Sequence, residues 1–441
     1  MAPVSERAPD AAAVERAVAV LRSRLDARTA AFLSSCVRCG LCADTCHVFL
    51  ADGEAESAPA AKVERLGRLF RRHHTVLGRL TPGFVGARDL DQDALAALAT
   101  AAFGRCTMCG RCALNCSVGL DPAAIVRFAR TMLGAAGLVP KGIRANADLA
   151  LATGNNMGIS REDVLETVAW LEQDLRDTLR DRSAAMPVDR AGARALYALN
   201  PREVKFFPLS LSAAGAIFHA AGESWTLTST DFDITNYGYF AADAAEARAI
   251  AERLVARAQA LGVEELIVAE CGHGYRVLRW EVPEWLGRPL PFRVRSFVEV
   301  MAEYLAEDRI RLDPARNAAR VTLHDPCNLV RNGGVVEEQR VLLRAAAADF
   351  VEMTPNRADN YCCGGGGGML AASEHAAKRV EAGRIKADQI RATGAKEVAS
   401  PCHNCIDQLM ELNKAYQLGV EIRTLAEIVA DALVLPGATD R

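Results

Sequence analysis

The sequence of 441 residues contains no apolar run that approaches the length needed to cross a bilayer, about 18–20 residues. It also lacks an excess of either charge, because 52 lysines and arginines nearly balance 55 aspartates and glutamates. Residues 1–30 are charged and rich in alanine and arginine, unlike a signal peptide. These absences argue against a membrane-spanning, secreted or nucleic-acid-binding protein. We expect a cytoplasmic chain of two to three domains, or one that docks on a membrane complex from the cytoplasmic side.

Cysteine is abundant, and thirteen of the fourteen cysteines fall into three groups. Two groups share the spacing C-x2-C-x2-C-x3-C; their members are Cys36, Cys39, Cys42 and Cys46, and Cys106, Cys109, Cys112 and Cys116. In iron–sulfur proteins with this spacing, three thiolates of one run hold one cluster and the fourth cysteine reaches the other. The spacing therefore predicts two cubane [4Fe–4S] clusters. Their ligands would be Cys36, Cys39, Cys42 and Cys116 for the first, and Cys106, Cys109, Cys112 and Cys46 for the second.

Zinc ribbons and disulfide bonds are the alternatives for these two runs. Zinc sites rarely use a four-cysteine run with this spacing, and disulfides need an oxidising compartment. The proline that usually follows the fourth cysteine is missing from both runs, which weakens the match to a simple ferredoxin but removes no ligand. The stretch between the runs reads largely as helix over 60–80 and 91–103, so we expect a helical cluster domain. His47 is either a cluster neighbour that tunes the potential or a surface or hydrogen-bonded histidine.

The pattern changes along the chain in a way that predicts several domains. We expect an N-terminal helix over 1–30, a helical two-cluster domain over 31–140 and a helical connector over 141–200. The remaining chain alternates strands with helices, which indicates α/β layers with a parallel sheet. Strands are predicted at 225–230, 265–270, 321–325 and 396–400, and single helices over 242–262 and 373–394. The N-terminal helix is amphipathic, so it is either a docking element or a solvated helix.

The second half of the chain contains an internal duplication. Helix, glycine, strand and cysteine follow one another up to Cys271, and the same order recurs up to Cys402. Asn236-Tyr237-Gly238-Tyr239 aligns with Asn360-Tyr361-Cys362-Cys363, and Gly274 stands where Cys405 stands in the second copy. We therefore expect a degenerate first copy over 201–312, which cannot hold a cluster alone, and a complete second copy over 313–441.

The third cysteine group carries a resemblance to a known family. Its members are Cys327, the adjacent pair Cys362–Cys363, and Cys402 with Cys405. This arrangement resembles the CCG domain of the B and D subunits of heterodisulfide reductase, and its combination with two cubane runs is similar to the D subunit. The motifs CVRCGLCADTCH, CTMCGRC, ECGHGY and NYCCGGGGGM most resemble the DsrK, TmcB and HmcF subunits of respiratory membrane complexes, which keep one complete CCG motif. The implied fold is α+β and multidomain, a helical two-[4Fe–4S] ferredoxin-like domain followed by a duplicated α/β CCG domain.

The resemblance implies that the five cysteines of the third group bind one noncubane [4Fe–4S] cluster. A plain cubane with a spare thiol is the alternative. The glycine run Gly364–Gly368 lacks the lysine of a phosphate-binding loop, and we expect it instead to allow close backbone approach to the cluster. His324, Asp325 and His403 would be proton donors or structural neighbours of the ligands. Cys271 and His273 are candidate catalytic residues, with His273 expected to lower the pKa of the thiol, and a buried inert cysteine is the alternative.

The resemblance further implies an electron-transfer subunit with heterodisulfide-reductase-like thiol–disulfide chemistry. Its partners would be a cytochrome b-like membrane subunit that exchanges electrons with quinone, other subunits of a respiratory complex, and a thiol or disulfide substrate. Two alternatives stay open. One is the iron–sulfur subunit of a flavin-dependent glycolate, lactate or glycerol-3-phosphate oxidase, and the other is an electron wire without catalysis.

Overall fold

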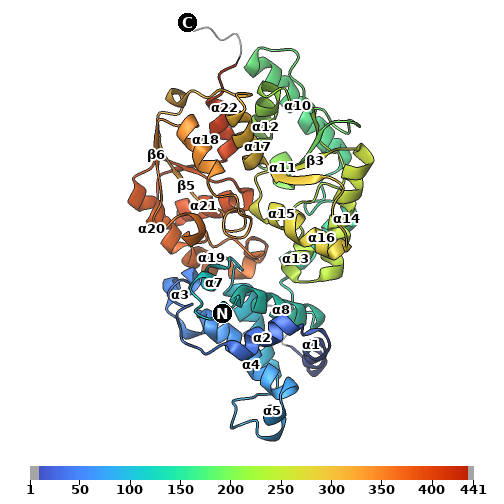
Figure 1. Ribbon diagram of the computed structural model, residues 1–441, viewed down its shortest axis with the longest axis vertical. Coiled ribbons are helices and arrows are strands. Elements are labelled where there is room, and N and C mark those ends of the chain that lie inside the picture. Colours follow the sequence, from blue (N-terminus) through green and yellow to red (C-terminus); the bar gives the residue numbers. More distant parts are fainter. Residues whose placement is uncertain (1–8, 436–441) are drawn as a thin grey trace. The chain divides into compact units, whose positions relative to one another are not determined.

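A computed structural model describes residues 9–435, which divide into two compact units (Figure 1). Unit 1 comprises the described residues up to Ala145 together with Tyr237–Asp243 and Tyr361–Ala387. Unit 2 comprises Asn146–Asn236, Ala244–Asn360 and the described residues from Asp388 onward. Among residues 9–435, no helix combines the length and the apolar character needed to cross a membrane. Residues 1–8 of the predicted N-terminal helix and residues 436–441 of the predicted second copy lie outside the described range.

Unit 1 is helical, as predicted for the cluster domain. Its helices are α1 (Ala11–Arg24), α2 (Ala27–Ser35), α3 (His47–Asp52), α4 (Pro59–His74), α5 (Val76–Leu80), α6 (Gln92–Ala99), α7 (Arg111–Leu114), α8 (Pro122–Ala135), α13 (Tyr237–Ala241) and α19 (Ala376–Ala382). Aspartates begin several of them: the Asp10 and Asp121 side chains accept hydrogen bonds from the first turns of α1 and α8. Helix α1 packs on α8 and buries Ala17 and Leu21. The apolar face of this helix is therefore used inside unit 1, which argues against its predicted role in docking.

Unit 2 contains two four-stranded parallel sheets. Their strands are β1 (Ala195–Ala198), β2 (Trp225–Thr226), β3 (Glu265–Val268), β4 (Arg293–Ser296), β5 (Arg320–Leu323), β6 (Asp349–Val351), β7 (Glu397–Ala399) and β8 (Glu421–Arg423). The strand orders are β2-β1-β3-β4 and β6-β5-β7-β8. Both sheets thus have one topology, which confirms the predicted duplication and the α/β fold class.

The two copies in unit 2 pack reciprocally. The helices that lie wholly in this unit are α10 (Arg161–Leu179), α11 (Pro201–Lys205), α12 (Pro208–Ala220), α14 (Ala244–Leu261), α15 (Gly272–Arg276), α16 (Val282–Leu286), α17 (Phe297–Ala306), α18 (Glu338–Ala346), α21 (His403–Tyr416) and α22 (Leu425–Asp431), while α9 (Lys141–Thr153) and α20 (Arg384–Thr393) join the units. Helix α12 of the first copy contacts α22 of the second, and the equivalent helices α18 and α17 contact each other. Such exchanged contacts are those of a two-fold pair, so the copies form a pseudo-dimer.

Several elements differ from the sequence-based expectation. The four predicted strands are present as β2, β3, β5 and β7, but β1, β4, β6 and β8 were not predicted. The helix predicted over 373–394 is two helices, α19 and α20, because the chain is interrupted at Gly383. The domain boundaries proposed from the sequence stay predictions. The structure adds that the segment around Cys362–Cys363 packs in unit 1, together with the equivalent segment of the first copy, Tyr237–Asp243.

A buried carboxyl group makes the stability of unit 2 sensitive to pH. Glu203 is fully buried, where it accepts hydrogen bonds from the Tyr197 hydroxyl at 2.8 Å and from the Asn200 backbone N–H at 2.6 Å. Burial raises the pKa of Glu203 from 4.5 to about 7, because the surroundings disfavour the charged carboxylate. The protonated form is therefore the one that the folded chain prefers.

We predict that this group loses its stabilising contribution as the pH rises. The contribution is complete below pH 4.5 and disappears as the pH passes about 7, which amounts to at most about 3 kcal/mol at higher pH. Thermal unfolding at several pH values should show a smaller decline for Glu203→Gln, whose amide does not titrate. The exposed Glu307→Gln should keep the wild-type decline. An unchanged pH dependence in Glu203→Gln would contradict the assignment.

Candidate metal centres

The two cysteine runs of unit 1 fold into loops of one local conformation. Arg38 and Gly40 have φ angles of 58° and 87°, and Met108 and Gly110, which occupy the same places in the second run, have φ angles of 52° and 76°. A left-handed conformation costs a residue other than glycine roughly 1–2 kcal/mol, so it is kept only where the surroundings require it. The repeated spacing is therefore matched by a repeated backbone structure.

Each loop faces a cavity lined by four cysteines, three from its own run and the fourth from the other. One cavity is lined by Cys36, Cys39, Cys42 and Cys116. The other is lined by Cys106, Cys109, Cys112 and Cys46. Burial, with negative charge at Cys106 and Cys46, raises the pKa of Cys112 well above its usual value. The structure thus brings the cysteines together in the crossed grouping expected from the spacing.

The surroundings of these cavities suit anionic sulfur. Backbone N–H groups donate to thiol sulfur from Met108 to Cys106 at 3.4 Å and from Leu120 to Cys116 at 3.2 Å. Such hydrogen bonds accompany the thiolate ligands of iron–sulfur clusters and tune their potentials. Four thiolates in each pocket therefore fit the donor set of a [4Fe–4S] cluster.

Arg130 supplies a buried positive charge beside the second cavity. Its side chain is fully buried and donates to the carbonyl oxygens of Ala102, Cys106, Phe240 and Gly367, at 2.6–3.1 Å. No carboxylate pairs with it among residues 9–435. Burial, opposed by negative charge at Cys106, lowers the pKa of Arg130 to about 10. An unpaired buried cation is unfavourable, and thiolate-bound iron next to Cys106 would provide the missing negative charge.

The glycine run packs against the loop of the second cysteine run. A Cβ atom on Gly366 would lie 2.9 Å from the carbonyl oxygen of Thr107, and one on Gly367 would lie 2.9 Å from the Thr107 carbonyl carbon. Gly367 also has a φ angle of 64°, which favours glycine. The Gly364 N–H donates to the sulfur of Cys362 at 3.4 Å. The run therefore permits close backbone approach, with the protein loop between Cys106 and Cys109 as its neighbour.

His47 connects the second cavity with Cys362 inside unit 1. The imidazole is buried, with Nε2 3.1 Å from Thr107 Oγ1 and Nδ1 3.0 Å from the Ala382 carbonyl oxygen. Burial lowers the pKa of His47, but a hydrogen bond to Cys362 and negative charge at Cys362 and Cys46 outweigh this effect and raise it. Of the two roles left open by the sequence, His47 is hydrogen-bonded and is also a direct neighbour of cysteine sulfur.

Cys271 and Cys402 lie at equivalent places in the two copies of unit 2. Each comes three residues after a strand, β3 or β7, and each immediately precedes a helix, α15 or α21. The backbone N–H of Cys271 donates to Ala269, and that of Cys402 donates to Ser400 in the same turn. The two thiols are hydrogen-bonded to each other, and both are buried. Residues that contact their own equivalents lie at a two-fold axis, so this pair marks the pseudo-axis.

The expected lowering of the Cys271 pKa by His273 is wrong. The hydrogen bond to Cys402, followed by burial, raises the pKa of Cys271 well above its usual value. Hydrogen bonds from Cys271 and Cys405 lower the pKa of Cys402. Of the two thiols, Cys402 is thus the more acidic. His273 is buried in the first turn of α15, two residues after Cys271.

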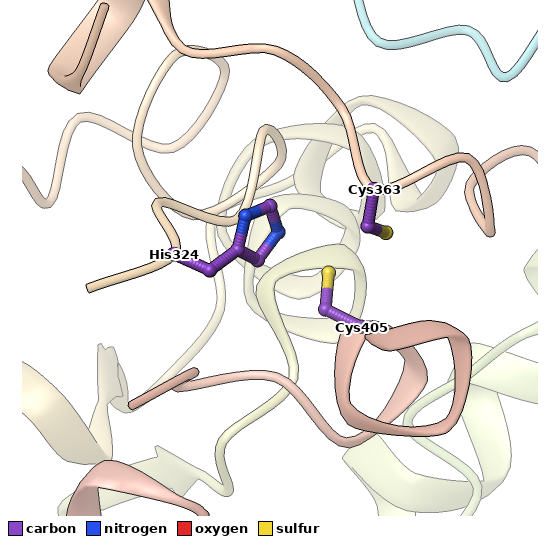
Figure 2. A group of neighbouring side chains, drawn as sticks. All are labelled: His324, Cys363 and Cys405. Atoms are coloured by element: carbon purple, nitrogen blue, oxygen red, sulfur yellow. The ribbon is translucent and has the colours of Figure 1, made fainter. Parts of the chain in front are cut away.

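The other cysteines of the third group are also buried, as are Cys271 and Cys402. Figure 2 shows His324 and Cys405 of unit 2, whose ligand atoms lie within 4.8 Å of each other, and also labels Cys363 of unit 1. His324 directly follows β5, so the strand end brings a nitrogen donor beside a thiol. Histidine nitrogen and cysteine sulfur are both metal-ligand types.

Asp325 and His403 are held in structural hydrogen bonds. The Asp325 carboxylate accepts from the Arg340 guanidinium at 2.8 and 2.9 Å, and from Gln339 at 2.6 Å. His403 lies with Nε2 2.9 Å from Ser210 Oγ and Nδ1 3.0 Å from the Glu270 carbonyl oxygen. Burial lowers the pKa of His403 to about 4, so its imidazole is neutral. These contacts favour a structural role for Asp325 and His403 over a role as proton donors.

Arg202 is a residue of this region that the sequence analysis missed. It follows β1 by four positions, as Cys327 follows β5, and both come directly after a proline. Its guanidinium donates to Asn404 at 3.1 Å and pairs with Asp407, and its charge acts on Cys271. The sequence itself shows this equivalence, because Asn-Pro-Arg in the first copy aligns with Asp-Pro-Cys in the second. The first copy thus carries a cation where the second carries a cysteine.

Two family models match the chain. Residues 32–120 match the family described as 4Fe-4S dicluster domain, and residues 321–410 match the family described as cysteine-rich domain. The first match includes every cysteine of the two runs, and the second includes the whole third group. The chain therefore combines a dicluster domain with a CCG domain, as its resemblance implied.

Similar proteins extend this likeness over most of the chain. The Hdr-like menaquinol oxidoreductase iron-sulfur subunit 2 of Archaeoglobus fulgidus is 28% identical over 92% of this chain and 80% of its own length. The D subunit of the dihydromethanophenazine:CoB--CoM heterodisulfide reductase of Methanosarcina mazei is 28% identical over 91% of this chain and 94% of its own length. A probable membrane-anchored ferredoxin of Chromohalobacter salexigens is 25% identical over 90% of this chain and 59% of its own length. The resemblance to the D subunit of heterodisulfide reductase and the iron–sulfur character are confirmed.

We predict that Arg130→Met destabilises the folded chain by at least about 2 kcal/mol, because several buried carbonyl oxygens lose their donor. Urea unfolding of cluster-loaded protein under anaerobic conditions would measure the change. The control is Arg68→Met, which removes an exposed side chain paired with Glu64 at 3.4 Å and should change stability by less than about 0.5 kcal/mol. Equal effects of the two substitutions would show that the buried hydrogen bonds of Arg130 contribute little.

Proposed function

We propose that this chain is an iron–sulfur electron-transfer subunit of a membrane-bound respiratory redox complex, with heterodisulfide-reductase-like thiol–disulfide chemistry at its CCG domain. The proposal follows the names of its relatives, one an Hdr-like menaquinol oxidoreductase subunit and another a heterodisulfide reductase subunit. One structural observation carries it. In unit 1, buried His47 contacts both Thr107, in the loop of the second cysteine run, and Cys362 of the third group.

In this proposal three clusters use thirteen cysteines. The first cubane takes Cys36, Cys39, Cys42 and Cys116, and the second takes Cys106, Cys109, Cys112 and Cys46, which is supported by the composition of the two cavities. A noncubane [4Fe–4S] cluster takes Cys327, Cys362, Cys363, Cys402 and Cys405, which is supported by the match of the cysteine-rich family to all five. When bound, such a cluster supplies one-electron chemistry and a site for sulfur.

The protein side chains provide the path and the surroundings for these electrons. Unit 1 contains both cubane cavities and the Cys362–Cys363 pair, which supplies two of the five proposed ligands of the third cluster. His47 and the glycine run keep Cys362 next to the loop of Thr107. Hydrogen bonds to cluster sulfur and solvent exclusion set the potentials of such centres. His47 is therefore positioned to influence the transfer between the second and third centres.

Cys271 and His273 are the proposed catalytic residues of the thiol–disulfide step. Cys271 is supported in this role by its hydrogen bond to Cys402, which brings a second thiol to a proposed ligand sulfur. A thiol there can donate its proton to a departing substrate thiolate or form a mixed disulfide with the substrate. His273 lies two residues further on and is buried in the same turn.

The proposed partners are a cytochrome b-like membrane subunit that exchanges electrons with quinone, further subunits of the complex and a thiol or disulfide substrate. The chain would lie on the cytoplasmic side of the membrane and attach through its partners. Two other functions stay possible on the same ligand set: the iron–sulfur subunit of a flavin-dependent glycolate, lactate or glycerol-3-phosphate oxidase, and an electron wire without catalysis. The degenerate first copy argues against the flavin-dependent class.

The cluster assignment predicts about twelve irons per chain, four for each of three clusters. Cys363→Ser should lower the iron content to about eight and remove the spectroscopic signature of the third cluster, while both cubane signals persist. Iron and acid-labile sulfide analysis with electron paramagnetic resonance on anaerobic protein measures both effects. Cys271→Ala is the matched control, because it removes a neighbouring thiol that is not a proposed ligand and should keep all iron. About eight irons in the wild type would contradict a third cluster.

The proposed electron donor can be tested on the purified native complex. A menaquinol analogue should reduce the clusters of this chain, as observed by electron paramagnetic resonance, whereas glycolate, lactate and glycerol 3-phosphate should not. Reduction by one of these three compounds without menaquinol would favour the flavin-dependent class. Cluster reduction by menaquinol without any turnover of a disulfide substrate would favour the electron wire.

A further inference from the structure

Unit 1 carries a cluster of exposed apolar side chains at the end of α4. Helix α5 and the loop after it present Val76, Leu77, Leu80 and Phe84, which are 71%, 58%, 73% and 89% exposed. We call these four residues the apolar tip. Figure 1 shows α5 beyond the end of α4, at the margin of unit 1. Several exposed apolar side chains within one short segment are unfavourable in water and are typical of surfaces that contact a partner or a membrane.

Polar contacts fix the turn that leads into the apolar tip. The Thr75 hydroxyl accepts from the Gly78 N–H at 3.0 Å and donates to the Arg71 carbonyl oxygen at 2.8 Å. A Cβ atom on Gly78 would lie 1.9 Å from that same oxygen, so the turn between α4 and α5 is tight and requires glycine. The four apolar side chains of the tip remain more than half exposed and are accessible to a partner surface.

Positive charge surrounds the apolar tip. Between Arg68 and Leu90 the sequence has five arginines and one aspartate, although the chain as a whole carries a net charge of −3. Arg79 and Arg88 are exposed, and within the described part of the chain neither forms an ion pair with a carboxylate. Arg22, Arg72, His73 and His74 line a depression beside them, together with Arg79 and Asp89. Arg72 pairs with Asp89 at 2.9 Å, so among residues 9–435 it is Arg79 and Arg88 whose charges have no carboxylate partner.

We propose that the apolar tip inserts into the surface of an anionic phospholipid bilayer, with Arg79 and Arg88 at the headgroup phosphates. Apolar side chains bordered by arginine, with an aromatic ring among them, match the boundary between acyl chains and charged headgroups. Basic residues close to such a surface are attracted to anionic lipid. The contact goes beyond the proposed function, because there the chain attaches through partner subunits, whereas here it binds lipid through its own residues.

The experiment is vesicle co-flotation of the full-length, cluster-loaded chain under anaerobic conditions. Vesicles of phosphatidylglycerol mixed with phosphatidylcholine should bind the wild type, and vesicles of phosphatidylcholine alone should bind it much more weakly. Leu80→Ser with Phe84→Ser should weaken binding at least about tenfold through lost apolar burial. Arg79→Gln with Arg88→Gln should weaken it roughly thirtyfold and reduce its salt dependence.

Phe206 and Leu209 of unit 2 provide the matched control. They are 56% and 60% exposed, so Phe206→Ser with Leu209→Ser makes the same chemical change elsewhere and should leave vesicle binding unaltered. Equal binding by the wild type and by both tip variants would overturn the proposal. So would a wild type that ignores vesicles but loses its association with a purified membrane subunit when Leu80 and Phe84 are replaced, because the tip would then dock on protein. Vesicle binding needs no electron transfer, so either result leaves the proposed function standing.

Discussion

The guanidinium of Arg130 joins the three chain segments that make up unit 1. It donates to Cys106 and Ala102 in the first segment, to Phe240 in the second and to Gly367 in the third. A buried cation without a carboxylate is unfavourable by itself. The free-energy cost of burying this cation falls when its N–H groups donate to carbonyl oxygens and when bound thiolates provide negative charge. The requirement to neutralise this charge therefore links the folding of a discontinuous unit to the filling of its second cavity.

The duplication explains why unit 1 is discontinuous. Both copies of the α/β fold leave unit 2 at the same place, after Asn236 and after Asn360, and both contribute the following segment to unit 1. The two segments have diverged, because the second carries Cys362–Cys363 where the first has Gly238–Tyr239. Arg127 stacks on Tyr239 with its guanidinium carbon 3.6 Å from the ring centroid. The first copy thus has a packing side chain where the second copy has a cysteine of the third group. Both segments nevertheless pack in unit 1.

The sequence was sufficient for features set by short spacing and insufficient for those set by distant packing. The cysteine grouping and the equivalence of Cys271 with Cys402 depend on local loops and strand ends, which a spacing displays. The buried role of Arg130 depends on three segments meeting, and nothing in its own helix indicates that. The pKa of Cys271 was misjudged for the same reason, since a histidine two residues away was visible while Cys402 was not. Short strands such as β6 and β8, of three residues each, carry too little pattern to be recognised.

The retained thiol of the first copy follows from its place at the pseudo-axis. Cys271 contacts its own equivalent, Cys402, so any side chain at 271 would be pressed against a proposed ligand sulfur. The side chain there must fit beside that sulfur at a buried position. It must also be able to form a hydrogen bond with the sulfur of Cys402, as the thiol of Cys271 does. A cysteine at 271 meets both conditions whether or not substrate sulfur ever reaches it, and the same hydrogen bond would stabilise electron density on the cluster side of Cys402.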